Sequence, residues 1–181
     1  MYFALDYLGH GSSVALLDGG LEKWSKEHGT TRTVPGNIAS AVLTVHPRPA
    51  LIIEMPAVKQ AVSSKNIALI DARSPMDYSG ANGGRRSGHI PGAKNVFWQE
   101  NMVSQGNSIL RPAAEIRARY ASLGIKFGAQ VIAYCKSGVQ AAYDYFTQKL
   151  TGFRPVLYDA SFAEWGNEFS APIETGNGGR F

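Results

Sequence analysis

The chain has 181 residues, of which 44% are hydrophobic and 18% charged, a composition ordinary for a globular domain. It contains no stretch of about 18 apolar residues, which excludes a membrane-spanning helix, and its single cysteine excludes an internal disulfide or a cysteine-based metal cluster. The net charge of +4 is not gathered in a long basic run, so it favours a small anionic substrate over a nucleic acid, and four scattered histidines give no reason to expect a metal or other cofactor.

The first 26 residues carry a motif that recurs near the other end of the chain. An apolar run ends in Asp18 and Trp24 follows, just as a later run ends in Asp159 and Trp165 follows. The match predicts a tandem repeat of one strand–helix unit, with chance similarity as the alternative. We therefore interpret residues 1–26 as the C-terminal remnant of an N-terminal domain whose body is absent. This start also lacks the features of a secretory signal, so a cytoplasmic protein is expected.

Residues 27–53 are rich in Thr, Pro, Val and Gly and predict an extended interdomain linker. From 54 to 170, short apolar strands alternate with helices, which is typical of an α/β domain with a mainly parallel central sheet flanked by helices. The Gly-rich residues 171–181 are expected to form a flexible tail. The elements expected in between are a helix over 56–62, a strand over 68–72, a loop over 73–94, a strand over 95–98, a helix over 111–123, a strand over 130–134, a helix over 140–150, a strand over 156–158 and a short helix near 162–165.

The only cysteine, Cys135, lies between the strand expected at 130–134 and the helix expected at 140–150. With Gly138 providing a tight turn, the N–H groups of the loop and of the first helical turn would point at the sulfur. The helix dipole and the adjacent Lys136 both favour a thiolate over a thiol. A lone cysteine is more often an inert core residue, but the strand–Cys–Gly–helix context favours a reactive one.

Five motifs between residues 69 and 165 resemble the rhodanese sulfurtransferases, specifically the C-terminal part of a two-domain thiosulfate or 3-mercaptopyruvate sulfurtransferase. They are residues 69–73 (LIDAR), 78–80 (YSG), 88–93 (GHIPGA), 135–141 (CKSGVQA) and 158–165 (YDASFAEW). The resemblance covers roughly residues 66–166. It implies one complete rhodanese-like domain over 54–170, preceded by a remnant of a second such domain.

The resemblance implies a two-step transfer through Cys135. Its thiolate would take the outer sulfur of thiosulfate as a persulfide, which cyanide, a thiol or a dithiol protein would then remove. The residues expected to bind the substrate are the loop residues Lys136, Ser137, Gly138, Val139, Gln140 and Ala141, together with Arg86 as a further anion contact. Lys136 would hold the sulfonate end of thiosulfate, while Asp71 and Arg73 would give structural support to neighbouring loops.

Several alternatives remain open at this point. Cysteine-dependent phosphatases place an arginine six residues after the cysteine, whereas this chain has Ala141, so a phosphatase is disfavoured. Ser137 is similar to members that use 3-mercaptopyruvate, but Asp77 stands where those members carry an arginine, so thiosulfate is favoured. The chain could instead be a non-enzymatic persulfide carrier or interaction module, or an inactive truncated product. Surface exposed by a missing domain would allow homodimerisation.

Overall fold

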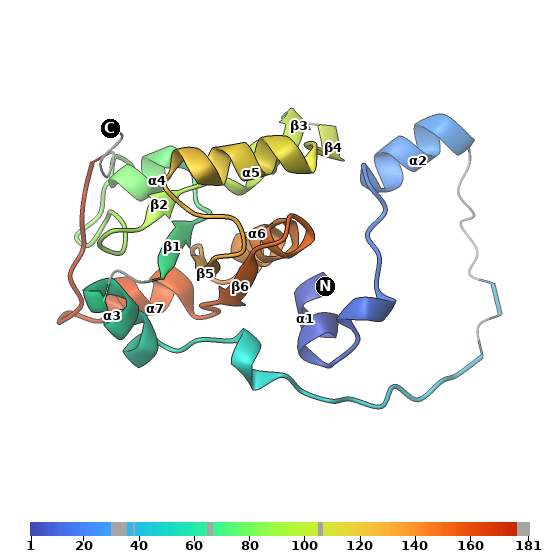
Figure 1. The fold of residues 1–181 in the computed structure, drawn as a ribbon, viewed down its shortest axis with the longest axis horizontal. Coiled ribbons are helices and arrows are strands. Elements are labelled where there is room, and N and C mark those ends of the chain that lie inside the picture. Colours follow the sequence, from blue (N-terminus) through green and yellow to red (C-terminus); the bar gives the residue numbers. More distant parts are fainter. Residues whose placement is uncertain (30–35, 38, 65–66, 105–106, 177–181) are drawn as a thin grey trace.

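A four-stranded parallel sheet forms the centre of the computed structural model, which describes residues 1–29, 36–37, 39–64, 67–104 and 107–176 (Figure 1). The strand order is β2-β1-β5-β6, and every neighbouring pair is parallel. The strands are β1 (Ala68–Asp71), β2 (Lys94–Asn95), β5 (Gln130–Tyr134) and β6 (Arg154–Leu157). The expected α/β class with a parallel central sheet is confirmed.

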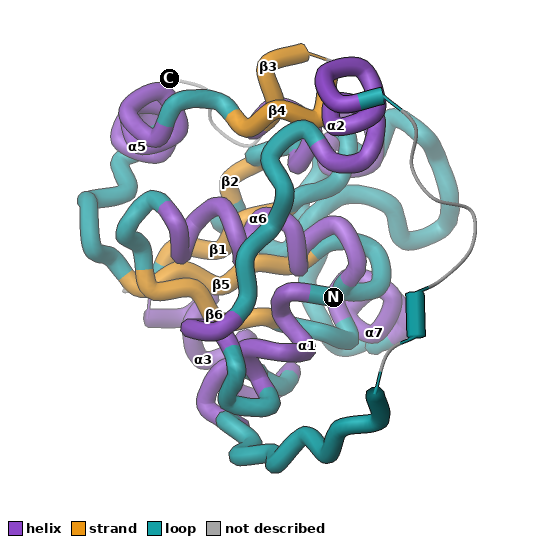
Figure 2. Tube along the Cα trace, turned by 90° about the vertical axis from the view of Figure 1, so that its right-hand side faces the viewer, coloured by secondary structure: helices purple, strands orange, loops and turns teal. Residues whose placement is uncertain are grey.

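Helices cover both faces of this sheet (Figure 2). They are α3 (Met55–Ser64) and α7 (Ser161–Asn167) on one face, and α5 (Ala113–Ser122) and α6 (Val139–Leu150) on the other. Because side chains alternate along a strand, Ile132 and Tyr134 pack with α3 and α7, while Ala133 and Cys135 pack against α6. The cysteine thus continues the set of β5 side chains that faces α6.

The segment between β1 and α5 contains more structure than the sequence predicted. Within the expected loop 73–94, α4 (Pro75–Ser79) forms, and a hairpin of β3 (Met102–Ser104) and β4 (Asn107–Leu110) was not expected at all. In place of the strand expected over 95–98, the strand β2 covers Lys94–Asn95, because a 3-10 helix, η3 (Trp98–Asn101), begins at Trp98.

The N-terminal residues lie against the domain through α1 (Tyr2–Tyr7), which packs on α6 (Figure 1). A 3-10 turn, η1 (Gly11–Ser13), and α2 (Gly20–His28) follow. Of the first repeat copy, the helix forms, but residues 14–17 form no strand. A strand is stabilised by its neighbours in a sheet, and here none is paired with this run.

The expected linker and tail also make contacts. After the 3-10 turn η2 (Pro49–Leu51), Ile52 forms a parallel bridge with Leu157 beside β6, and Glu174 forms an antiparallel bridge with His89. Residues 171–176 therefore follow the domain surface, where we expected a flexible tail, because backbone groups at 89 and 174 satisfy one another. The remaining linker positions 30–35 and 38 and tail positions 177–181 lie outside the described residues. No helix in the described part of the chain is long and apolar enough to cross a membrane.

Candidate active site

The loop after β5 begins at Cys135, at the carboxyl end of the central sheet. Cys135 is only 1% exposed, while Lys136 and Ser137 are exposed. Gly138 has φ +80°, and a Cβ there would lie 2.5 Å from a carboxylate oxygen of Asp159 and 2.9 Å from its carbonyl oxygen. Since only glycine tolerates both the left-handed backbone and this close approach, the turn into α6 depends on Gly138.

Ser161 fixes this loop from the start of α7. Its Oγ accepts hydrogen bonds from the N–H groups of Cys135 and Gly138, both at 3.1 Å, and donates to the carbonyl of Tyr158 at 2.8 Å. In return, the N–H of Phe162 donates to the Cys135 carbonyl at 3.0 Å. Ser161 is fully buried, with φ +57°. We did not single it out in the sequence, where only its place in the 158–165 motif marked it.

The remaining N–H groups of the loop are open. Those of residues 136, 137 and 139–141 have no hydrogen-bond acceptor among the described residues, whereas the Gly138 N–H, expected to face the sulfur, is taken by Ser161. The open N–H groups belong to the first turn of α6 and the loop before it. Unpaired donors at a helix N-terminus favour a bound anion.

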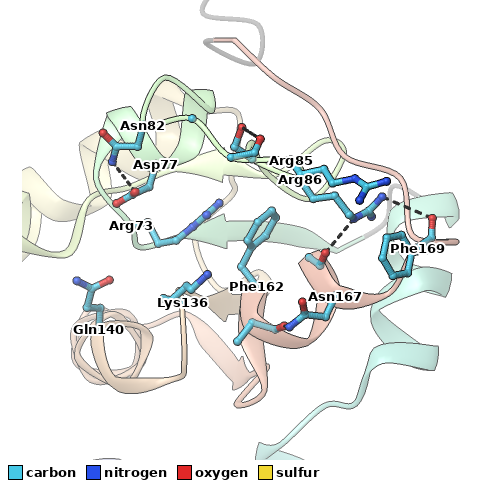
Figure 3. Close-up of a pocket in the computed structure, with 15 residues that line it drawn as sticks. Arg73, Asp77, Asn82, Arg85, Arg86, Lys136, Gln140, Phe162, Asn167 and Phe169 are labelled. Carbon is cyan, nitrogen blue, oxygen red and sulfur yellow. Dashed lines mark hydrogen bonds between the residues drawn. The ribbon is translucent and has the colours of Figure 1, made fainter.

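A pocket of about 620 Å³ opens beside the loop (Figure 3). Of the residues predicted to bind or support the substrate, it is lined by Lys136, Gln140, Arg73 and Arg86. Its other walls include Asp77, Arg85, Phe162 and Phe169. The other predicted site residues, namely Cys135, Ser137, Gly138, Val139, Ala141 and Asp71, do not line it.

Asp71 and Arg73 form a buried ion pair at the end of β1. The Arg73 Nε lies 3.0 and 3.1 Å from the two Asp71 carboxylate oxygens, and its Nη2 donates to the Gly88 carbonyl at 2.7 Å. Burial would lower the pKa of the guanidinium, but its hydrogen bonds and ion pair with Asp71 raise it. The guanidinium also lies 4.0 Å from the centre of the Phe162 ring, so it ties β1 to the start of α7.

Arg86 is held by the other side of the pocket. Its guanidinium donates to the carbonyls of Gly166 at 2.8 Å, Glu168 at 3.0 Å and Ala171 at 2.5 Å. These bonds tie the loop after α4 to the end of α7. Since they occupy its donors, the contact with substrate expected of Arg86 stays a prediction, and the neighbouring Arg85 is the more available cation.

Asp77 stands at the pocket wall as an ionised carboxylate. Burial alone would raise its pKa, but hydrogen bonds from Ser74 and Asn82 and the charges of Arg73 and Lys136 hold that pKa below its ordinary value. The Ser74 hydroxyl donates at 2.7 Å and the Asn82 amide at 2.6 Å. A negative charge at this wall disfavours a substrate carboxylate beside it.

Among the described residues, no group of three His, Cys, Asp or Glu side chains could hold a metal ion. The arrangement places a cysteine in a loop with open N–H groups, next to a pocket with several cationic side chains.

Comparison with known proteins agrees with this geometry. The family model described as a rhodanese-like domain matches residues 54–168. A thiosulfate sulfurtransferase from Corynebacterium glutamicum is 35% identical, with 96% of this chain and 61% of the relative covered. A sulfur carrier protein, TtuD, from Thermus thermophilus is 32% identical, with 97% and 66% covered. The chain thus spans less than two thirds of the length of these relatives.

Solved structures share the fold. The anaerobic ergothioneine biosynthesis enzyme from Chlorobium limicola, solved with trimethyl histidine, superposes with a TM-score of 0.83 at 24% identity, covering 97% of this chain and 44% of that one. A variant of EanB with a cysteine persulfide and ergothioneine has a TM-score of 0.83 at 25% identity, with the same coverage.

Proposed function

The chain belongs to the rhodanese-like family, and from this premise we propose that it transfers sulfur from thiosulfate to a thiophilic acceptor through a persulfide on Cys135. One observation carries the proposal: the only cysteine directly follows the central strand β5 and begins a loop with open N–H groups beside a cationic pocket. The relatives named thiosulfate sulfurtransferase and the persulfide recorded on EanB support it.

In the first step, the Cys135 thiolate attacks the outer sulfur of thiosulfate. A new S–S bond forms on Cys135 while the S–S bond of thiosulfate breaks, and sulfite leaves with the electron pair. The open N–H groups of the loop stabilise the anionic sulfur, and Lys136 pairs with the sulfonate oxygens. Because Cys135 is buried, the donor reaches the sulfur past the exposed side chains of Lys136 and Ser137.

In the second step, an acceptor nucleophile attacks the outer sulfur of the persulfide and Cys135 leaves as a thiolate. Cyanide would yield thiocyanate, and a thiol would yield a new persulfide. Ser161 and Phe162 keep the loop in one position through both steps by their hydrogen bonds to Cys135. A loop organised in advance avoids reorganisation during the reaction.

A second candidate function is delivery of the sulfur to a partner protein without turnover on small acceptors. The name of the Thermus thermophilus relative, a sulfur carrier, favours this alternative. 3-Mercaptopyruvate is a weaker donor candidate, because the Asp77 carboxylate stands in the pocket wall.

The intact mass of the protein before and after thiosulfate, followed by a cyanide chase, tests the proposal. We expect the mass to rise by one sulfur atom, and cyanide to remove that atom with release of thiocyanate. Cys135→Ser should gain nothing, and since Cys135 is the only cysteine the assignment is unambiguous. Loading without discharge to cyanide, but with discharge to a dithiol, would support the carrier. A folded protein that loads from neither thiosulfate nor 3-mercaptopyruvate would overturn both.

A further inference from the structure

Residues 171–176, which we call the C-terminal strap, follow α7 and run back along α4 and the segment that joins it to β2 (the red segment of Figure 1). Backbone hydrogen bonds fix the strap there. The His89 N–H donates to the Glu174 carbonyl at 2.8 Å, and the Glu174 N–H donates to the His89 carbonyl at 3.0 Å. Nearer its end, the Gly176 N–H donates to the Ser79 carbonyl at 2.8 Å.

Glu174 adds its side chain to these backbone contacts. Its carboxylate accepts a hydrogen bond from the Gly92 N–H at 3.0 Å. The same oxygen lies 3.6 Å from the His89 Nε2, a buried atom without a hydrogen-bond partner among the described residues. Gly88 fits beside the strap only because it lacks a side chain, since a Cβ there would lie 2.1 Å from the Glu174 carbonyl oxygen. Contacts this close hold the strap against residues 88–92.

Gly88 connects the strap with the side chains that support the Cys135 loop. Its carbonyl accepts a hydrogen bond from the Arg73 Nη2 at 2.7 Å. The Arg73 guanidinium packs on the Phe162 ring, and the Phe162 N–H donates to the Cys135 carbonyl. A displacement of Gly88 is therefore transmitted to the loop through groups that are packed or hydrogen-bonded to one another.

The strap reaches the same loop by a second route, through α7. The Pro172 carbonyl accepts a hydrogen bond from the Trp165 indole at 2.8 Å. Trp165 is fully buried in α7, whose first residue, Ser161, accepts the hydrogen bond from the Cys135 N–H. The strap is thus linked to both supports of the loop, the end of β1 and the start of α7.

We infer that the C-terminal strap positions the Cys135 loop for reaction, and that Glu174 is the residue that holds the strap in place. Glu174 acts through other residues, so it is a positioning residue rather than a catalytic one. The inference rests on the proposed function, because its readout is formation of the Cys135 persulfide. When the strap detaches, the loop loses its fixed arrangement, and the thiolate is less often aligned with the donor.

A pair of proline variants tests the inference. Glu174→Pro removes the N–H that donates to His89 and the carboxylate that accepts from Gly92, whereas Thr175→Pro removes an N–H that has no acceptor among the described residues. In Glu174→Pro, hydrogen exchange of the His89 N–H should become about tenfold faster. The rate of persulfide loading at saturating thiosulfate should fall severalfold. Thr175→Pro should match the wild type in both measurements.

Two milder variants carry the test if Glu174→Pro does not fold. Glu174→Ala removes only the carboxylate and should change both rates in the same direction, by less than Glu174→Pro. Glu174→Gln keeps an oxygen for the Gly92 N–H and should restore most of the loading rate. All rates are compared in folded protein, well below the unfolding temperature of each variant.

Faster exchange at His89 with a wild-type loading rate would overturn the inference, because the strap would then support only the fold. Unchanged exchange in the Glu174 variants, or an equal loss of loading in Glu174→Pro and Thr175→Pro, would overturn it as well. In each of these cases, loading of the wild type at Cys135 leaves the proposed sulfur transfer standing. Absence of loading in the wild type would refute that transfer, and the positioning role with it.

Discussion

At the scale of single residues, Ser161 does the most to shape the site although it need not touch the substrate. Its hydroxyl joins two N–H groups of the Cys135 loop to the carbonyl of Tyr158, in a fully buried position. Removing it leaves these buried groups without their partner, which costs about 1–3 kcal/mol of unfolding free energy. We therefore expect Ser161→Ala to lower both the stability of the protein and the rate of persulfide formation.

The backbone of Ser161 provides a second readout for the same prediction. With φ +57°, this residue is in the left-handed region, where a non-glycine residue is strained by about 1–2 kcal/mol. Ser161→Gly loses the same hydroxyl but relieves that strain, so urea unfolding should find it more stable than Ser161→Ala. Equal loss of the persulfide rate in both variants would assign the rate effect to the hydroxyl. Two variants with wild-type rates would show that Ser161 does not position the loop.

At the scale of elements, α6 is joined to η3 by a buried polar contact. The Asn101 amide donates to Asp144 at 2.9 Å, and burial raises the pKa of Asp144 well above its ordinary value of 3.8. The second carboxylate oxygen of Asp144 has no partner among the described residues, nor do the amide oxygens of Asn101 and Gln148. Because burial disfavours the charged carboxylate, we expect the neutral acid in the folded protein.

The pH dependence of stability tests the state of Asp144. Above pH 3.8 and up to its raised pKa, the folded protein keeps a proton that the unfolded chain releases, so stability falls as the pH rises, by at most about 1.4 kcal/mol per pH unit. Asp144→Asn removes this dependence, and urea unfolding should find it progressively more stable than the wild type as the pH rises above 4. Glu54→Gln, at an exposed carboxyl, is the control. A destabilisation that is the same at every pH would contradict the prediction.

The elements that the sequence predicted well are those with strong local patterns. The strand over 130–134 and the helix over 140–150 were close to β5 and α6, because an apolar run and a regular helical pattern flank the cysteine. The helix α4 was missed although Ser74, Pro75 and Asp77 form the start signal of a helix, with Asp77 donating its N–H to Ser74. A helix of five residues is too short to show a helical period of apolar residues in the sequence.

The rest of the site depends on contacts far apart in the sequence. The strands of the β3–β4 hairpin have only three and four residues, too short to show an alternating pattern, so their ends are set by pairing. Likewise, Arg86 donates hydrogen bonds to carbonyls of residues 166–171, and Ser161 accepts one from the Cys135 N–H. These partners lie 26 to 85 residues apart in the sequence, so no local pattern predicts the contacts. Local sequence could therefore place the cysteine loop, but not the groups that hold it.

At the scale of the whole molecule, the N-terminal segment is attached to the domain rather than free of it. The N–H groups of His46 and Arg48 donate to the carbonyls of Leu8 and Tyr7, at 2.9 and 2.7 Å. Tyr2 and Phe3 pack against the cluster that contains Cys135. The structure thus joins residues 1–8, the end of the linker and α6 around the side of the sheet that carries the cysteine (Figure 1).

Asp6 holds this assembly together, and its carboxylate is fully buried. It accepts hydrogen bonds from Lys149, from Tyr145 at 2.7 Å and from Arg48 at 3.0 Å. Burial alone would raise the pKa of Asp6, but these hydrogen bonds and the charges of Lys149 and Arg48 hold it below the ordinary value of 3.8. The ionised carboxylate therefore stabilises the docked state of α1 above pH 3.8, and this contribution is lost as the pH falls through the lowered pKa.

Asp6→Asn should consequently lower the free energy of unfolding by about 1–2 kcal/mol near neutral pH, a modest figure because Arg48 and Lys149 are partly exposed. The difference from the wild type, measured by urea unfolding from pH 3 to pH 7, should shrink as the pH falls below about 4. Hydrogen exchange should show faster exchange at residues 2–8 in the variant, with β5 unchanged. Unchanged exchange at α1, or a loss that is equal at pH 3 and pH 7, would show that docking rests on Tyr2 and Phe3 instead. Because Tyr2 and Phe3 pack against the cluster that contains Cys135, release of this segment would also expose part of that cluster.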